Sequence, residues 1–269
     1  MSRLFAFGAI DAETLARRAS SFGGQAAAYA RERPDYPDDA VLWALDPVSD
    51  RVPLRVLDLG AGTGKLTEVL LRHTSGLAEG AKVTEVIAVE PDPAMLDQLR
   101  RRLPGARALA GSAEKIPLPD GAVDAILVGQ ALHWFDLDRA LPEMARVLTP
   151  GGVLAGLWNL DDDQIPWVRE LKRVARSTVS FTNWRAEEIP LRGPWFREVE
   201  QVRFPHVQRR TAETMAATIA THSHVLTLPG SERAELLARV VDYLRSTPET
   251  AHGEFELPII TAVVRAPRE

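Results

Sequence analysis

The sequence predicts an α/β fold in which a parallel β-sheet is covered by helices on both faces. Short, continuously apolar runs recur between residues 55 and 158, and amphipathic helical patterns separate them. A strand that is buried on both faces has an uninterrupted apolar sequence, and helical crossovers are the usual connections between parallel strands. The 269 residues are enough for one large domain or two small ones.

The predicted elements follow in chain order. The first strands are predicted at 55–59, 86–89, 106–110, 123–128 and 153–158. Helices are predicted before and between them, at 26–31, 38–45, 66–73, 93–103 and 139–148. The last third has predicted helices at 167–179, 212–221 and 232–244, and predicted strands at 199–207 and 256–264. A turn is predicted at 149–152, because proline presets φ and glycine accepts a positive φ.

Composition narrows the classes of function. Lys and Arg total 32 and Asp and Glu total 37, so the net charge is −5, which argues against non-specific binding of nucleic acid. The chain has no cysteine, which excludes disulfides, thiolate metal sites and a cysteine nucleophile. No apolar stretch reaches the ~18 residues of a membrane span. We therefore expect a cytoplasmic protein with neither a membrane nor a nucleic-acid partner.

A glycine-rich turn, Gly60-Ala61-Gly62-Thr63-Gly64, separates the first predicted strand from its helix. Glycines let a backbone approach a ligand closely, and a helix N-terminus favours an anionic or polar group. A GxxxxGK[ST] phosphate loop would need glycine at position 59 and Ser or Thr at 66, where the chain has leucines. A GxGxxG dinucleotide fingerprint would need its third glycine at 65, where the chain has lysine. Its third glycine comes one residue early, at Gly64, so a dinucleotide fits less well. A third class, a nucleoside with an amino-acid tail, tolerates the GxGxG spacing because no pyrophosphate has to fit.

Glu90 ends the second predicted strand, 26 residues after Gly64. A carboxylate at this position can accept hydrogen bonds from ribose hydroxyls. By itself the residue fits a solvated strand end equally well, but behind a glycine-rich turn ribose binding is the better interpretation.

Several motifs together resemble one enzyme family. VLDLGAGTG at 56–64 is similar to motif I of class I S-adenosylmethionine (SAM)-dependent methyltransferases, and GSAEKIPLPD at 111–120 resembles their GDAExLPFPD segment. ALHWF at 131–135 and LTPGG at 148–152 resemble motifs of the UbiE and trans-aconitate branch, which has a type 11 methyltransferase domain. YARERPDYP at 29–37 is similar to the YxxxRPxYP segment of that branch. The resemblance covers about residues 50–160.

This resemblance implies a Rossmann-like class I methyltransferase fold, with a seven-stranded, mostly parallel sheet whose last strand is antiparallel. It implies one structural domain in three parts: an N-terminal helical lid at 1–45, a SAM-binding core at 46–160, and the remaining strands at 161–269. Within the last part, helices at about 208–250 would form an insertion that caps the substrate.

The resemblance also implies roles for single residues. Gly60, Ala61 and Gly62 would lie under the methionyl part of SAM, and Glu90 would hold the ribose. The adenine contacts would come from Pro91, Met95, Ser112 and Ala113. Many family members have Asp where this chain has Ser112, so the adenine contact follows the family pattern less closely than the ribose contact.

Further residues would complete the pocket. Gln130 and Ala131 would face it after the fourth strand, Arg33 would bind the cofactor carboxylate, and Tyr29 would close the lid. His133 is a candidate general base, although it fits a pocket-lining or helix-capping role better. The run Asp161-Asp162-Asp163 fits a solvated turn better than a magnesium site, so we expect no metal.

The implied reaction is methyl transfer from SAM to an O, N or C nucleophile of a small-molecule acceptor, mainly by proximity and desolvation. The alternatives are a tRNA or protein methyltransferase on the same fold, a SAM-binding protein without catalysis, and an NAD-dependent oxidoreductase. The sequence predicts no particular oligomeric state.

Overall fold

The computed structural model describes residues 34–74, 83–177, 191 and 194–269. They fall into two compact units. The sheet unit consists of Asp35–Asn159, Arg185–Phe204 and Thr261–Glu269, and the helical unit includes Leu160–Trp184 and Pro205–Ile260. The helix predicted at 26–31 lies outside the described residues, as do Tyr29 and Arg33.

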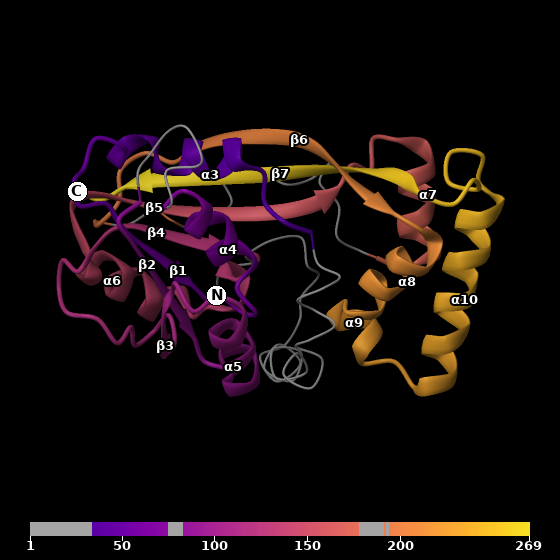
Figure 1. The fold of residues 1–269 in the computed structure, drawn as a ribbon, viewed down its shortest axis with the longest axis horizontal. Coiled ribbons are helices and arrows are strands. Elements are labelled where there is room, and N and C mark those ends of the chain that lie inside the picture. Colours follow the sequence, from indigo (N-terminus) through magenta and orange to yellow (C-terminus); the bar gives the residue numbers. More distant parts are fainter. Residues whose placement is uncertain (1–33, 75–82, 178–190, 192–193) are drawn as a thin grey trace. The chain divides into compact units, whose positions relative to one another are not determined.

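A seven-stranded sheet has the order β3-β2-β1-β4-β5-β7-β6. Its strands are β1 (Arg55–Leu59), β2 (Glu85–Glu90), β3 (Arg107–Ala110), β4 (Val123–Gly129), β5 (Leu148–Asp161), β6 (Glu200–Arg210) and β7 (Phe255–Pro267). The first five strands pair in parallel, and β7 runs antiparallel to its neighbours (Figure 1). The predicted fold class is therefore confirmed. The last three strands contribute residues to both units.

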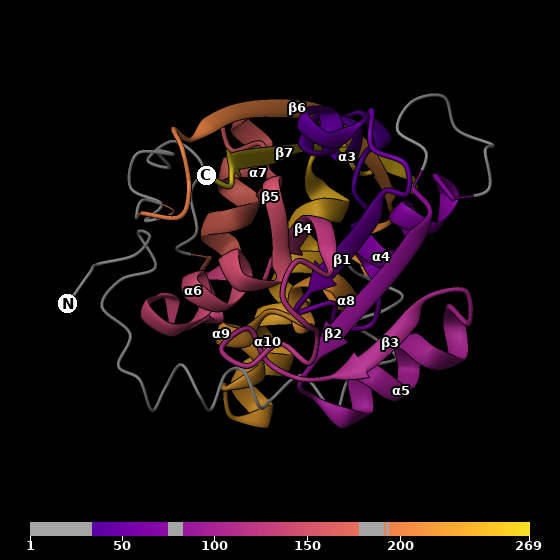
Figure 2. The same ribbon diagram turned by 90° about the vertical axis from the view of Figure 1, so that its left-hand side faces the viewer.

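Helices lie before and between these strands in the chain. They are α3 (Asp38–Leu45), η2 (Asp46–Val48), α4 (Lys65–Arg72), α5 (Pro93–Arg102), η3 (Leu132–Trp134), α6 (Leu137–Val147), α7 (Pro166–Val174), α8 (Ala212–Ala220), α9 (Ser223–Leu226) and α10 (Gly230–Ser246). In the sheet unit, α4 and α5 lie on one face of the sheet and α6 on the other (Figure 2). No helix among the described residues is long and apolar enough to cross a bilayer.

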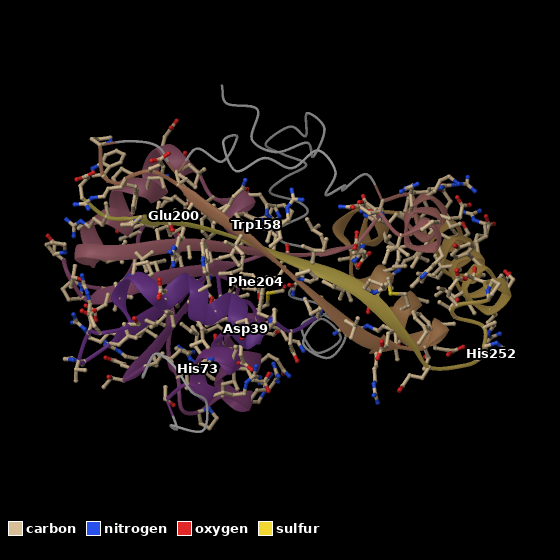
Figure 3. All side chains as sticks on the ribbon, turned by 90° about the horizontal axis from the view of Figure 1, so that it is seen from above. Asp39, His73, Trp158, Glu200, Phe204 and His252 are labelled. Atoms are coloured by element: carbon tan, nitrogen blue, oxygen red, sulfur yellow. The ribbon has the colours of Figure 1, made fainter. Side chains whose placement is uncertain are left out.

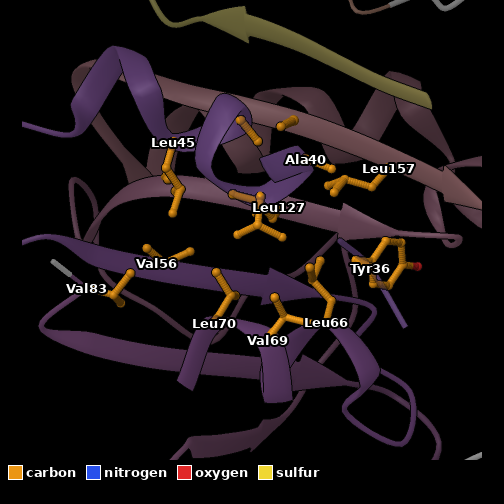
Figure 4. Close-up of a cluster of buried hydrophobic side chains, with 14 of the residues drawn as sticks. Tyr36, Ala40, Leu45, Val56, Leu66, Val69, Leu70, Val83, Leu127 and Leu157 are labelled. Carbon is orange, nitrogen blue, oxygen red and sulfur yellow. The ribbon is translucent and has the colours of Figure 1, made fainter. Parts of the chain in front are cut away.

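Apolar packing holds the sheet unit together. One buried cluster joins α3 and α4 to β1, β4 and β5, and it includes Leu45, Val56, Leu70 and Leu127 (Figure 4). Each of these side chains is fully buried. The apolar runs that predicted the strands therefore face helices, as expected for a parallel sheet. Phe204, labelled in Figure 3, lies in the outer strand β6. Its ring packs against that of Trp43, with the centroids 6.4 Å apart.

Local signals explain where α5 begins and ends. The Asp92 side chain accepts hydrogen bonds from the backbone N–H groups of Ala94 and Met95, both at 2.9 Å, which caps the helix N-terminus. Three arginines occupy the last turn, where positive charge suits the helix dipole. One of them, Arg102, also donates to the carbonyl of Thr63 at 2.9 Å, so the end of α5 is tied to the glycine-rich turn.

The predicted turn at 149–152 is wrong, because these residues lie within β5. Val123 pairs with Leu148 and Ala125 pairs with Val153, so the residues between 148 and 153 form a bulge in the ladder. Gly151 has φ +66°, and this positive φ is the part of the turn prediction that the structure retains.

The helix predicted at 167–179 is also too long, because α7 ends at Val174. Arg176 has φ +54°, and the N–H of Ser177 donates to the carbonyl of Lys172 at 2.9 Å. This bond and the left-handed residue before it are features of a Schellman motif, which stops a helix. The motif usually contains glycine, so an arginine in its place gave no signal in the sequence.

A buried carboxylate fastens the amino end of β4. Asp124 accepts hydrogen bonds from the backbone N–H of Arg55 at 2.9 Å, the Arg51 guanidinium at 3.2 Å and the Thr149 hydroxyl at 3.1 Å. Burial raises the pKa of Asp124, but the hydrogen bonds from Arg55 and Arg51 outweigh it and hold this pKa below the ordinary 3.8.

We expect Asp124→Asn to lower the free energy of unfolding at pH 7 by about 2 kcal/mol, because charge-assisted hydrogen bonds are lost. A lowered pKa stabilises the fold above the unfolded-state value and loses that effect as pH falls. The difference between wild type and variant should therefore shrink below pH 3.8. Urea unfolding over a pH series measures it, with exposed Asp97→Asn as the control. Equal losses in both variants would contradict the prediction.

Candidate functional site

The glycine-rich turn joins β1 to α4 at the carboxyl end of the sheet. Its glycines have φ +72° at Gly60, +57° at Gly62 and +88° at Gly64. The N–H groups of Gly60 and Ala61 both donate to the carbonyl of Val89 in β2. A Cβ built on Gly60 would lie 2.8 Å from Ala131 Cβ, so both the backbone conformation and the close approach require glycine here.

Glu90 lies beside this turn with its carboxylate held by the backbone. One oxygen accepts from the Gly62 N–H at 2.8 Å, and the other accepts from the Asp92 N–H at 2.9 Å. The residue is only 6% exposed. Burial raises the pKa of Glu90, which the two backbone hydrogen bonds partly offset. Each carboxylate oxygen has more than one lone pair, so the group can still accept from ligand hydroxyls.

The residues predicted to contact adenine lie next to Glu90. Met95, in the first turn of α5, is buried, and its sulfur lies 3.8 Å from where a Gly62 Cβ would be. The segment after β3 is attached to the end of β2, because the Gly111 N–H donates to the backbone carbonyl of Glu90 at 3.4 Å. In this segment Ser112 is half-buried and Ala113 is buried, whereas Pro91 on the other side of the carboxylate is exposed.

A second part of the site follows β4. Gln130 has φ +58°, an uncommon value for a residue with a side chain. The chain then brings Ala131 against Gly60. His133 lies in the short helix η3, half-buried, with its ring centroid 4.7 Å from that of Trp134. The structure thus brings Gly60, Glu90 and Ala131 to the same end of the sheet.

Sequence reasoning missed one buried acid under the turn. Asp58 in β1 is 1% exposed, and one of its oxygens accepts from the Thr67 hydroxyl at 2.6 Å. Within the described residues, its Oδ1 has no hydrogen-bond partner, and neither has the buried hydroxyl of Thr63. Burial raises the pKa of Asp58 to about 7, although hydrogen bonds from Thr67 lower it and Glu90 adds a further rise. The sequence signal that could have indicated this buried acid is an aspartate within an otherwise apolar strand.

Other candidates have structural partners in the helical unit. Asp163 is buried and pairs with the Lys172 ammonium at 3.0 Å, so it is not part of a solvated turn as predicted. His222 precedes α9, and its ring centroid lies 5.8 Å from that of His224 within this short helix. Within the described residues, no group of three His, Cys, Asp or Glu could hold a metal ion.

Comparison with known proteins agrees with this arrangement. The methyltransferase domain family matches residues 57–156. A Mycobacterium tuberculosis protein named an uncharacterized methyltransferase is 42% identical over 247 residues, which cover 91% of this chain and 95% of that protein. The chain belongs to the methyltransferase family. An uncharacterized methyltransferase of Schizosaccharomyces pombe is 32% identical over 238 residues, covering 87% of this methyltransferase and 91% of its own chain.

Solved structures lead to the same class. A protein from Anaeromyxobacter dehalogenans, provisionally assigned as a type II methyltransferase, aligns with a TM-score of 0.63 at 26% identity and covers 88% of this methyltransferase and 97% of its own chain. The protein is therefore a class I SAM-dependent methyltransferase, and SAM is its cofactor. The oxidoreductase alternative is set aside.

The residues at the carboxyl end of the sheet fit SAM. Gly62 has φ +57°, and among the described residues a Cβ built there would meet only the Met95 sulfur, at 3.8 Å, so its backbone leaves room for a ligand. Two buried carboxylates, Asp58 and Glu90, have raised pKa values because they are buried. SAM carries a positive sulfonium and a positive ammonium, so its charge complements this pair of acids.

Proposed function

We propose that this methyltransferase transfers a methyl group from SAM to an O, N or C nucleophile of a small-molecule acceptor. One observation carries the proposal: the Gly60–Gly64 turn contacts both the buried Glu90 carboxylate and the segment that begins at Gln130. Together these provide a nucleoside site that adjoins the end of β4. A net charge of −5 favours a small molecule over a nucleic acid as the acceptor. The cytoplasmic location predicted from composition is part of this proposal.

In the proposed site, Glu90 holds the ribose hydroxyls, and Gly60, Ala61 and Gly62 lie under the methionyl part. Adenine is contacted by Pro91, Met95, Ser112 and Ala113. Gln130 and Ala131 follow β4 and face the cofactor pocket. Tyr29 and Arg33, outside the described residues, keep their predicted roles at the lid and the cofactor carboxylate, and the cap at about 208–250 stays a prediction.

When bound, SAM supplies a methyl group on a positively charged sulfur, which is already electrophilic. The protein therefore has to align the acceptor and exclude water, and alignment alone can supply about 7–11 kcal/mol of the barrier. His133 is the candidate base for acceptors that must lose a proton, since imidazole titrates near neutral pH.

Incubation with SAM that carries a labelled methyl group tests this proposal. The acceptors are a panel of carboxylic acids, phenols and amines, with total tRNA and unfolded protein alongside. We expect label in at least one small molecule and none in tRNA or protein. Label only in tRNA or protein would establish the runner-up function. Tight binding of S-adenosylhomocysteine (SAH) without any transfer would indicate a SAM-binding protein without catalysis.

A further inference from the structure

The turn at Gln130 is held by the neighbouring strand β5. Gly129 is the last residue of β4 and pairs with Leu157, and the Gln130 N–H donates to the Leu157 carbonyl at 2.9 Å. The next acceptor along β5 is the carbonyl of Asn159. The side-chain amide of Gln130 donates to it at 2.7 Å, in place of the backbone N–H that a longer β4 would have supplied.

Because the side chain of Gln130 makes this hydrogen bond, the backbone is free to leave the sheet here. With φ +58°, Gln130 turns the backbone away from β5, and the next residue, Ala131, lies against Gly60. A residue with a side chain is strained in this conformation and keeps it only where its surroundings hold it. The two hydrogen bonds to β5 are therefore what fix the contact between Ala131 and the glycine-rich turn.

Asn159 is itself held from two directions. The hydroxyl of Thr261 in β7 donates to Asn159 Oδ1 at 2.5 Å, and Asn159 Nδ2 donates to the carbonyl of Asp35 at 3.0 Å. Because a carbonyl can only accept, the amide orientation is determined by Asp35. Thr261 is fully buried, so its hydroxyl bond is made away from water.

The segment that contains Asp35 is also attached next to the glycine-rich turn. The Asp35 carboxylate pairs with the Lys65 ammonium at 2.9 Å, and Lys65 is the first residue of α4, directly after Gly64. The next residue, Tyr36, is buried beside Leu66 (Figure 4), and its hydroxyl lies 2.6 Å from where a Gly129 Cβ would be. Residues 35–36 thus lie against both the turn and the end of β4.

We propose that Thr261, Asn159 and Gln130 form a positioning relay, in which the buried hydroxyl of β7 fixes Asn159 and Asn159 holds the left-handed turn that sets the cofactor-side surface at Ala131. The relay rests on the proposed function, because it takes the Gly60–Gly64 turn as the SAM site. Thr261 and Asn159 are positioning residues, since they act through Gln130 and not on the reacting atoms. Nothing in the local sequence around Thr261 indicates such a role.

Thr261→Val tests the relay, because valine has nearly the same shape and lacks the hydroxyl. We expect SAH, measured by calorimetry, to bind about fivefold to tenfold more weakly, which corresponds to the loss of one buried hydrogen bond. Hydrogen exchange should speed up at the Gln130 N–H, far from the substitution in sequence. Thr261→Ser keeps the hydroxyl and should restore the affinity to within about twofold.

A matched control distinguishes the positioning role of Thr261 from a purely structural one. Thr250 is also buried, and its hydroxyl donates to the Leu244 carbonyl at 2.5 Å in the helical unit. Thr250→Val should lower stability to urea without changing SAH affinity or exchange at Gln130. If Thr261→Val lowers stability but leaves SAH affinity and Gln130 exchange unchanged, the relay is overturned.

A second pair of variants works even if Thr261→Val does not fold. Gln130→Ala and Gln130→Gly both lose the side-chain amide, but only glycine adopts φ +58° without strain. We expect the glycine variant to bind SAH at least about threefold more tightly than the alanine variant. Equal binding, or tighter binding by the alanine variant, overturns the relay.

The relay and the proposed site fail in different ways. Glu90→Ala is measured in parallel, because Glu90 belongs to the proposed cofactor site and has no part in the relay. If Glu90→Ala leaves SAH affinity unchanged, the cofactor site is assigned wrongly, and the relay falls with it. If Glu90→Ala weakens SAH binding and Thr261→Val does not, only the relay is wrong.

Discussion

Glu90→Ala is expected to weaken SAH binding about 10- to 150-fold. Hydrogen bonds to a charged group contribute about 1.5–3 kcal/mol, and the buried carboxylate is the group proposed to accept from the ribose hydroxyls. Alanine also removes the acceptor of the Gly62 and Asp92 N–H groups, which should loosen the glycine-rich turn. Calorimetric titration with SAH measures the change, with NAD⁺ alongside as a ligand that should not bind.

Two further variants make this result specific. Glu90→Gln keeps the side-chain volume but turns its NH₂ group toward one of the two backbone donors, so it should also bind SAH weakly. Glu85→Ala removes a carboxylate from the other end of the same strand, where it pairs with Arg107 on the surface. It should bind SAH as the wild type does. Wild-type affinity in Glu90→Ala would exclude Glu90 from ribose binding.

Asp58→Asn is expected to stabilise the ligand-free protein at pH 8 and to weaken SAM binding about tenfold or more. Asparagine has almost the same shape and can still accept from the Thr67 hydroxyl, but it carries no buried charge. The ionised Asp58 favours the positively charged cofactor, so the same substitution removes an attraction in the complex. Stability gained at the cost of binding is typical of a functional site.

The pH dependence has a definite sign. Because the pKa of Asp58 is raised to about 7 from 3.8, the folded protein binds a proton more tightly than the unfolded chain does. Wild-type stability should therefore fall as pH rises through this window, and the advantage of Asp58→Asn should grow over the same range and level off above it. SAM affinity of the wild type should increase toward pH 7 and that of the variant should change less.

Urea unfolding and calorimetry over a pH series measure both effects. Asp97→Asn is the control, because Asp97 is exposed on α5, where it pairs with Arg100 at 3.7 Å. If Asp58→Asn binds SAM as tightly as wild type, Asp58 has no role in cofactor binding. If Asp58→Asn is less stable than wild type at pH 8, the prediction that the buried charge of Asp58 destabilises the ligand-free protein is wrong.

Most of the fold could be predicted because its signals are local. The apolar runs of β1, β2 and β4 and the helical spacing of α4 and α10 each lie within a few residues, and the structure confirms all of them. The motifs at 56–64 and 111–120 implied the family and with it the antiparallel last strand. Where a local signal was missing, as at the left-handed Arg176, the prediction of the helix end was wrong.

The sequence by itself thus determined the element types, the glycine-rich turn and an acid at the end of the second strand, because each depends on neighbouring residues. Only the tertiary structure decided which polar groups are buried and what they contact. The bond between Thr261 and Asn159 joins residues 102 positions apart. Such contacts arise from the packing of whole strands, and no periodicity within one segment encodes them. The raised pKa of Asp58 also depends on tertiary structure, because the surrounding elements bury its carboxylate.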